Sequence, residues 1–210
     1  MIKTGCCGFP KGMQHYFEEF RLVELQTTFY KLPRLETARK WRAMAPRNFE
    51  FTLKVSQLIT HEPRSPTYRR SGIKIPEDKE AVYGSFRPTE EVFSAWEGTK
   101  EICEALESRI VVFQCPASFK PTAEHVKNMK EFFSSIRRRT VRDRSLELVW
   151  EPRGRWDARV IGELCEDLKL SHCTDPFAAD VVHATQIAYF RLHGSPPGKR
   201  GITTITRRKT

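Results

Sequence analysis

Polar and charged side chains recur at the ends of the apolar runs of this sequence, and together they suit acid–base chemistry on an anion. Glu24, Glu151 and His193 are the residues expected to act in catalysis, because carboxylates and imidazoles donate and accept protons. The residues expected to bind substrate are Gln26, Thr28, Lys54, His61, Gln114, Arg153 and Arg191. Since arginine and lysine hold phosphates and carboxylates, the set indicates an anionic substrate.

The same positions offer ligands for a hard divalent metal ion, which binds carboxylate oxygen and imidazole nitrogen. The four candidate metal ligands are Glu24, Glu151, Asp175 and His193. A strong metal motif such as H-E-x-x-H is missing. A divalent metal cofactor and metal-free catalysis therefore both stay open.

The sequence has no motif for nucleotide binding or for a serine nucleophile. The phosphate loops GxxxxGK[ST] and GxGxxG and the nucleophile elbow GxSxG are all missing. The six cysteines form no C-x-x-C pair, so they are expected to be reduced thiols of the interior.

Seven β-like runs would position these residues, and helical patterns separate most of the runs. The predicted strands lie at 2–8, 22–30, 49–55, 109–116, 146–154, 170–176 and 187–194. Helices are predicted at 36–46, 88–108, 122–138 and 157–168, with Thr89 as an N-cap. Strands that alternate with helices imply parallel β-α-β units.

Several of these strands have one polar face, which favours a closed barrel over an open doubly wound sheet. In the third run, Phe51 and Leu53 share one face and Thr52 and Lys54 the other. We expect a TIM-type β/α barrel of the α/β class, in which working residues gather at the C-terminal ends of strands. The chain, 1–210, is expected to be one domain with a long loop at about 56–88 that covers the site.

Composition bears on the location of the protein and on the kind of partner that it binds. Hydrophobic residues make up 39% and charged residues 30% of the 210, which excludes a disordered chain. No run approaches the roughly 18 apolar residues of a membrane span, and no export signal is evident, so a cytoplasmic location is expected. The net charge of +10 favours an anionic small molecule or nucleic acid as partner, or is simply a solvated basic surface.

The motifs resemble those of the DUF72, or YecE-like, family. From Thr4 to Gly194 the chain carries, in the family's order, GCCGF, VELQTTFYKLP, KW with a proline, FEFTLKVSQLITH, VFQCP, WEPRGRW and YFRLHG. The resemblance implies a TIM-type barrel whose biochemical role is poorly defined. Its shape is similar to the barrels of sugar isomerases and apurinic endonucleases, an analogy of fold alone.

Two departures from the family pattern stand out. Gln26 replaces the asparagine that members usually carry, and after Gly194 the family's tyrosine-rich segment, helix and final strand are replaced by SPPGKRGITTITRRKT. The barrel is therefore expected to be incomplete at its C-terminus. Exposed sheet edges favour association, so a homo-oligomer is expected.

Three functions follow as hypotheses. The first is a hydrolase-like enzyme acting on a phosphate-bearing substrate, such as a nucleic-acid phosphodiester, with or without a metal ion. The second is a non-catalytic barrel that binds an anionic ligand or nucleic acid. The third, a sugar-phosphate isomerase, needs the same site and no nucleic acid.

Overall fold

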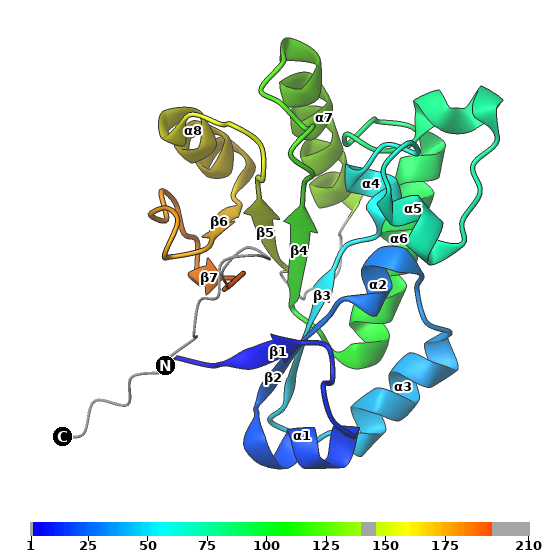
Figure 1. Ribbon diagram of the computed structural model, residues 1–210, viewed down its shortest axis with the longest axis vertical. Helices are drawn as coiled ribbons and strands as arrows, with labels where there is room; N and C mark the ends of the chain where they lie inside the picture. Colours follow the sequence, from blue (N-terminus) through cyan, green and yellow to red (C-terminus); the bar gives the residue numbers. More distant parts are fainter. Residues whose placement is uncertain (1, 140–145, 195–210) are drawn as a thin grey trace.

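The computed structural model describes residues 2–139 and 146–194, and its centre is one parallel sheet (Figure 1). The strands are β1 Gly5–Cys7, β2 Leu22–Leu25, β3 Glu50–Lys54, β4 Ile110–Gln114, β5 Glu147–Glu151, β6 Ser171–Thr174 and β7 Tyr189–Phe190. They pair in sequence order, each parallel to the next. This is the order of a TIM-type β/α barrel, and it confirms the predicted fold class.

Helices fill most of the connections between the strands. They are α1 Met13–Glu19, α2 Thr27–Tyr30, α3 Leu35–Met44, α4 Gln57–Thr60, α5 Thr67–Ser71, α6 Glu90–Leu106, α7 Ala123–Arg139 and α8 Ala158–Leu168, with a 3-10 helix η1 at Glu77–Val82. Thr89 and Asp157 cap α6 and α8 with their side-chain oxygens, which accept from Val92 N and Arg159 N. The N-cap predicted at Thr89 is therefore confirmed.

The second strand is shorter than predicted, and this corrects the placement of two site candidates. β2 ends at Leu25, so Gln26 and Thr28 are not strand residues. Thr28 instead lies in the single helical turn of α2. Its hydroxyl donates to the carbonyl oxygens of Leu25 and Lys54, both at 2.7 Å. The side-chain bonds of threonine compete with strand geometry in this way, and here they tie the ends of β2 and β3 together.

The long segment at about 56–88 contains the helices α4, α5 and η1 between its turns. Ser56 caps α4, and Tyr68 on α5 donates from its hydroxyl to the backbone oxygen of His61 at 3.0 Å. At the far end of the segment, Phe86 is buried against the rings of Phe113 and Phe132, with centroids 6.1 and 5.5 Å apart. The segment is thus anchored to the main core at several points.

The sheet curves, and its last described strand meets its first strands across the inside of the curve. The Tyr189 hydroxyl on β7 lies 3.0 Å from Thr52 Oγ1 on β3 and donates to Glu24 on β2. Within the described residues β7 pairs only with β6, and β1 only with β2. The ITTIT run lies outside the described residues.

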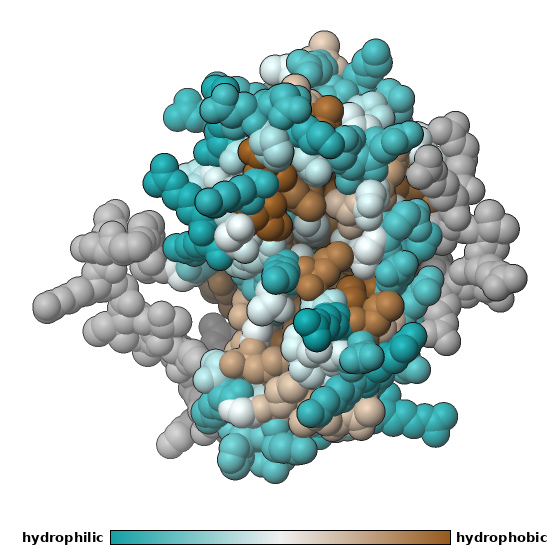
Figure 2. Space-filling model, turned by 90° about the vertical axis from the view of Figure 1, so that its right-hand side faces the viewer, coloured by the Kyte–Doolittle hydropathy of each residue, from teal (hydrophilic) through white to brown (hydrophobic). Residues whose placement is uncertain are grey.

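The outer surface carries apolar groups of its own. Figure 2 shows the side on which α3 and α5 lie, with an apolar band between polar regions. Leu35 and Met44 on α3 are exposed apolar residues. In the part of the chain that the structure describes, no helix is long and apolar enough to span a membrane.

Candidate active site at the strand ends

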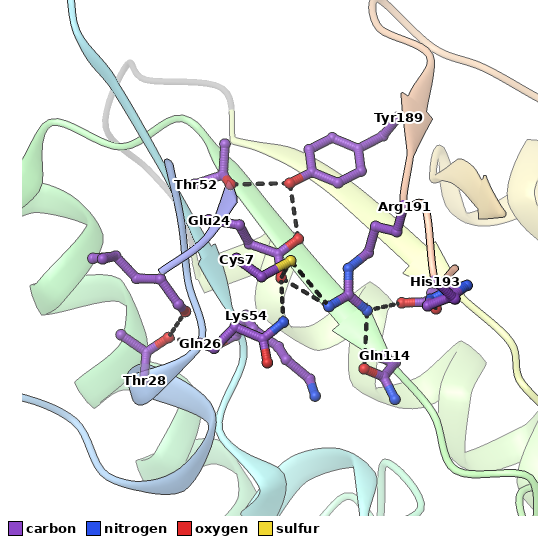
Figure 3. A network of polar contacts seen from close by, with 12 residues as sticks. Cys7, Glu24, Gln26, Thr28, Thr52, Lys54, Gln114, Tyr189, Arg191 and His193 are labelled. Atoms are coloured by element: carbon purple, nitrogen blue, oxygen red, sulfur yellow. Dashed lines mark hydrogen bonds and ion pairs between the residues drawn. The ribbon is translucent and has the colours of Figure 1, made fainter. Parts of the chain in front are cut away.

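The guanidinium of Arg191, two positions after Tyr189, lies at the centre of the polar cluster (Figure 3). Its Nη2 atom lies 3.1 Å from Glu24 Oε1, and its Nη1 atom donates to Gln114 Oε1 at 3.0 Å and to Glu151 Oε2. Burial lowers the pKa of Arg191, but the charges of Glu24 and Glu151 outweigh it, so the pKa lies above its usual value. Arg191 is therefore a permanent counter-ion for both carboxylates.

His193 forms a second branch of the cluster. Its backbone N–H donates to Asp175 Oδ2 at 3.0 Å, and its Nδ1 atom lies 3.4 Å from the same oxygen. Its Nε2 atom lies 2.6 Å from Arg153 Nη2 and 3.0 Å from Glu151 Oε1. Since a guanidinium can only donate, neutral His193 accepts at Nε2 and carries its proton at Nδ1. Both ring nitrogens of His193 therefore face partners within the cluster.

The carboxyl of Asp175 is held in its ionised form by the backbone. The N–H groups of His193 and Phe177 donate to it and lower its pKa. An ionised carboxylate facing Nδ1 orients an imidazole ring for proton transfer. Asp175 therefore holds the backbone of His193 and places a negative charge 3.4 Å from Nδ1.

Lys54 ends β3 and differs from the other cations of the site. Its side chain is buried, at 5% exposure, and Nζ lies 3.6 Å from the centroid of the Phe29 ring. Among the described residues Nζ has no hydrogen bond or ion pair, and no dashed line reaches it in Figure 3. Burial, and after it the charge of Arg191, lowers the pKa of Lys54 to about 8.

His61 packs against the same aromatic ring. Its ring centroid is 4.8 Å from that of Phe29, and its Nδ1 atom is 2.8 Å from Thr60 Oγ1. Burial, followed by the charges of Lys54 and Arg153, lowers the pKa of His61 to about 3. His61 is therefore a neutral imidazole at physiological pH.

The remaining candidates have supporting positions. Gln26 donates from Nε2 to Glu24 Oε1 at 3.2 Å, and Gln114 accepts from Arg191. Arg153 donates from Nε to Glu151 Oε1 at 2.9 Å, while its Nη1 atom has no partner among residues 2–139 and 146–194. The structure thus gathers the predicted residues at one end of the sheet, except that the Thr28 hydroxyl is used within the backbone.

Sequence reasoning missed two residues of the cluster. Tyr189 and Thr52 form a hydroxyl pair beside Glu24, and burial raises the pKa of Tyr189 well above its usual value. The available signal was alternation, because Tyr189, Arg191 and His193 are two positions apart and share a face of an extended chain. Cys7, expected with the other cysteines to be an interior thiol, is instead exposed, and its Sγ atom lies 3.8 Å from Arg191 Nη2.

The four candidate metal ligands do not fit a metal ion. The guanidinium of Arg191 lies between Glu24 and Glu151, which places a cation where the metal would be. In the described part of the chain, no three His, Cys, Asp or Glu side chains are grouped to hold a metal. The arrangement therefore corrects the expectation of a divalent ion at these residues, and no chemical step is assigned to one.

Gly84, at the end of the long segment, packs directly on the backbone of His61. A Cβ atom there would lie 2.4 Å from the His61 carbonyl oxygen and 2.7 Å from Glu62 N. Its φ of +77° also lies in the left-handed region that favours glycine. The position of His61 therefore depends on the absence of a side chain at residue 84.

Comparison with known families assigns the chain to one of them. The model of the protein family of unknown function DUF72 matches residues 7–208. The chain belongs to the DUF72 family. This confirms the resemblance seen in its motifs, and no functionally curated protein matches the sequence.

Solved structures agree with this assignment. A DUF72 family protein from Enterococcus faecalis is 20% identical with a TM-score of 0.65, over 95% of this chain and 76% of that one. A DUF72 family protein from Thermotoga maritima is 21% identical with a TM-score of 0.58, over 87% and 64%. Endonuclease IV from Thermus thermophilus is 15% identical with a TM-score of 0.46, over 83% and 62%. The likenesses to the two DUF72 family proteins concern the fold.

Proposed function

We propose that this DUF72 protein is an enzyme acting on a phosphate-bearing substrate at the C-terminal ends of its strands. The observation that carries the proposal is Lys54, a buried cation without an anionic hydrogen-bond partner among the described residues. Buried charges are costly unless they are paired, so an anionic group of a ligand would supply the missing partner. Arg153, partly exposed and with Nη1 unused among those residues, offers a second donor to the same anion.

The residues divide into two groups by the state of their charges. Glu24 and Glu151 are neutralised by Arg191, which assigns them a positioning role and leaves proton transfer to His193 and Lys54. For a phosphodiester, Arg153 would turn from His193 to the phosphate, and His193 Nε2 would then take a proton from the attacking water as its oxygen bonds to phosphorus. Lys54 would give a proton to the leaving oxygen as the old P–O bond breaks.

Turnover of bis(4-nitrophenyl) phosphate, measured with a metal chelator present, tests this reaction. We expect His193→Gln and Lys54→Met each to lower kcat/KM by at least about 100-fold, the usual size of an acid–base contribution. Lys130→Met is the matched control, because Lys130 is an exposed lysine paired with Asp167 on the outer helices. Equal rates for all four proteins would refute acid–base catalysis at this site.

The second candidate is a barrel that binds an anion without chemistry. The neutralised carboxylates favour it, since neither is free to act as a base. Titration with inorganic phosphate would then show binding that depends on Lys54, and no phosphate ester or diester would be turned over. A nucleic-acid partner has less support. Arg137, which begins the basic run 137–139, donates to the carbonyl oxygens of Leu168 and Lys169, so its guanidinium caps α8 and is not free for a phosphate.

A further inference from the structure

The surroundings of Lys54 suit a nucleophilic amine better than an anion-binding ammonium alone. Nζ lies over the face of Phe29 and not beside a carboxylate, although Glu24 and Glu151 both lie in the same cluster. Arg191 already neutralises both of these carboxylates. The two carboxylates still raise the pKa of Lys54, but burial and the charge of Arg191 outweigh them.

The free amine is present in useful amounts near neutral pH. With a pKa of about 8, roughly a tenth of Lys54 is unprotonated at pH 7. An ordinary lysine has about a thousandth or less in that form. Desolvation next to another cation is a known means of activating lysine as a nucleophile.

A neutral imidazole lies on the same aromatic ring. His61 contacts Phe29 edge-on, and its Nδ1 atom is paired with Thr60. With a pKa of about 3, the imidazole stays neutral near pH 7 and so adds no second positive or negative charge beside the amine.

We infer that Lys54 forms an imine with the carbonyl carbon of a phosphate-bearing aldehyde or ketone. The inference rests on the proposed phosphate site and adds a second kind of chemistry to it. Nζ forms a bond to the carbonyl carbon, and the oxygen takes up a proton to give a carbinolamine. Both protons that the amine loses pass to this oxygen, the first when the carbinolamine forms and the second as the hydroxyl becomes water. The C–O bond then breaks, water leaves, and a C=N bond remains with no change in oxidation state.

Reductive trapping tests the inference with glyceraldehyde 3-phosphate as the probe. The protein is incubated with the probe and sodium borohydride at pH 7.5, digested, and its lysine adducts are measured by mass spectrometry. We expect Lys54 to carry the dominant adduct. Unphosphorylated glyceraldehyde should label it about tenfold less, because one charge-assisted contact to phosphate is lost.

Two variants separate the roles of charge and nucleophile. Lys54→Arg keeps a cation for the phosphate but has no amine that can form an imine, so the adduct should vanish while titration with inorganic phosphate still shows binding. Lys130→Met should leave the Lys54 adduct unchanged. An oligonucleotide with an aldehydic abasic sugar serves as a third probe. If it labels Lys54 faster than the small aldehyde does, the source of the carbonyl is nucleic acid.

The possible outcomes distinguish failure of the imine from failure of the phosphate site. Adducts spread over exposed lysines and insensitive to Lys54→Arg overturn the imine, and if phosphate binding still depends on Lys54, the proposed phosphate site stands. A Lys54 adduct of equal yield with and without the probe's phosphate supports the imine and overturns the phosphate site. No adduct and no phosphate binding overturn both.

Discussion

Tyr189 donates a hydrogen bond to Glu24 Oε2 at 2.9 Å, across 165 positions of the sequence. The bond joins β7 to β2 through the interior of the curve, where no strand pairing connects them among the described residues. The curvature of the sheet at its two ends therefore depends partly on side chains of the candidate site.

Removing this hydroxyl should cost stability. Tyr189→Phe leaves Glu24 Oε2 without this donor, so we expect the free energy of unfolding to fall by about 1.5–3 kcal/mol, the usual value of a bond to a charged group. Urea titration measures it. Tyr83→Phe is the control, because the half-buried Tyr83 makes no hydroxyl bond among the described residues. An equal effect of both substitutions would show that the bond across the curve contributes nothing of its own.

Breaking the central ion pairs should have the largest effect of any single substitution in the cluster. Arg191→Met leaves Glu24 and Glu151 buried without their shared cation, and we expect a loss of about 3–5 kcal/mol. Arg159→Met removes an exposed i,i+4 pair with Glu163 and should cost no more than about 0.5 kcal/mol. A loss below about 1 kcal/mol for Arg191→Met, measured by urea titration against these values, would contradict its role as counter-ion.

His61 should make the fold sensitive to acid. Its pKa is about 3 in the folded state and about 6.5 when unfolded, so between these values the unfolded chain binds the extra proton. Stability should fall by about 2 kcal/mol from this residue alone between pH 7 and pH 5. Urea titrations of His61→Gln should show a correspondingly weaker pH dependence, and those of the exposed His15→Gln none of this change. Identical slopes for His61→Gln and the parent protein would contradict the buried neutral imidazole.

Lys54 should affect the free energy of unfolding at alkaline pH, whereas His61 affects it at acid pH. Its pKa is lowered to about 8 in the folded state, so between pH 8 and 10.5 the unfolded state binds more protons, and the contribution of Lys54 to stability rises with pH. Buried thiols such as Cys115, whose pKa is raised by burial, act against this trend, so the difference from Lys54→Met is the quantity to measure. From pH 7.5 to 9.5 the parent protein should gain about 2 kcal/mol relative to Lys54→Met. No change in this difference would show that the lysine titrates normally.

Most of the fold was predictable because periodicity reports which face of an element is buried. The alternation in 49–55 placed Lys54 opposite Phe51 and Leu53, and the structure confirms β3 there. β2 was predicted too long, because Thr27–Tyr30 has the composition of a strand, while the Thr28 hydroxyl stabilises a helical turn through distant Lys54. Such a contact cannot be read from local pattern.

The members of the site were predictable, but not how they interact. Position at strand ends brought Glu24, Glu151 and Arg191 into one set. That Arg191 would lie between the two carboxylates depends on how far the sheet curves. This arrangement does not fit the metal ion that the residue types had left open. The same curvature brings Tyr189 to Thr52, a pair that sequence reasoning missed.

The close packing of Gly84 on His61 affects how a mutational scan of this protein would be interpreted. Any side chain at position 84 would displace the imidazole, with a Cβ only 2.4 Å from its backbone oxygen. In a scan scored by activity, Gly84 should therefore be as intolerant as Lys54, although it offers no group to a ligand. If the abundance of each variant were measured alongside its activity, a residue that shapes the backbone could be distinguished from one that contacts the substrate.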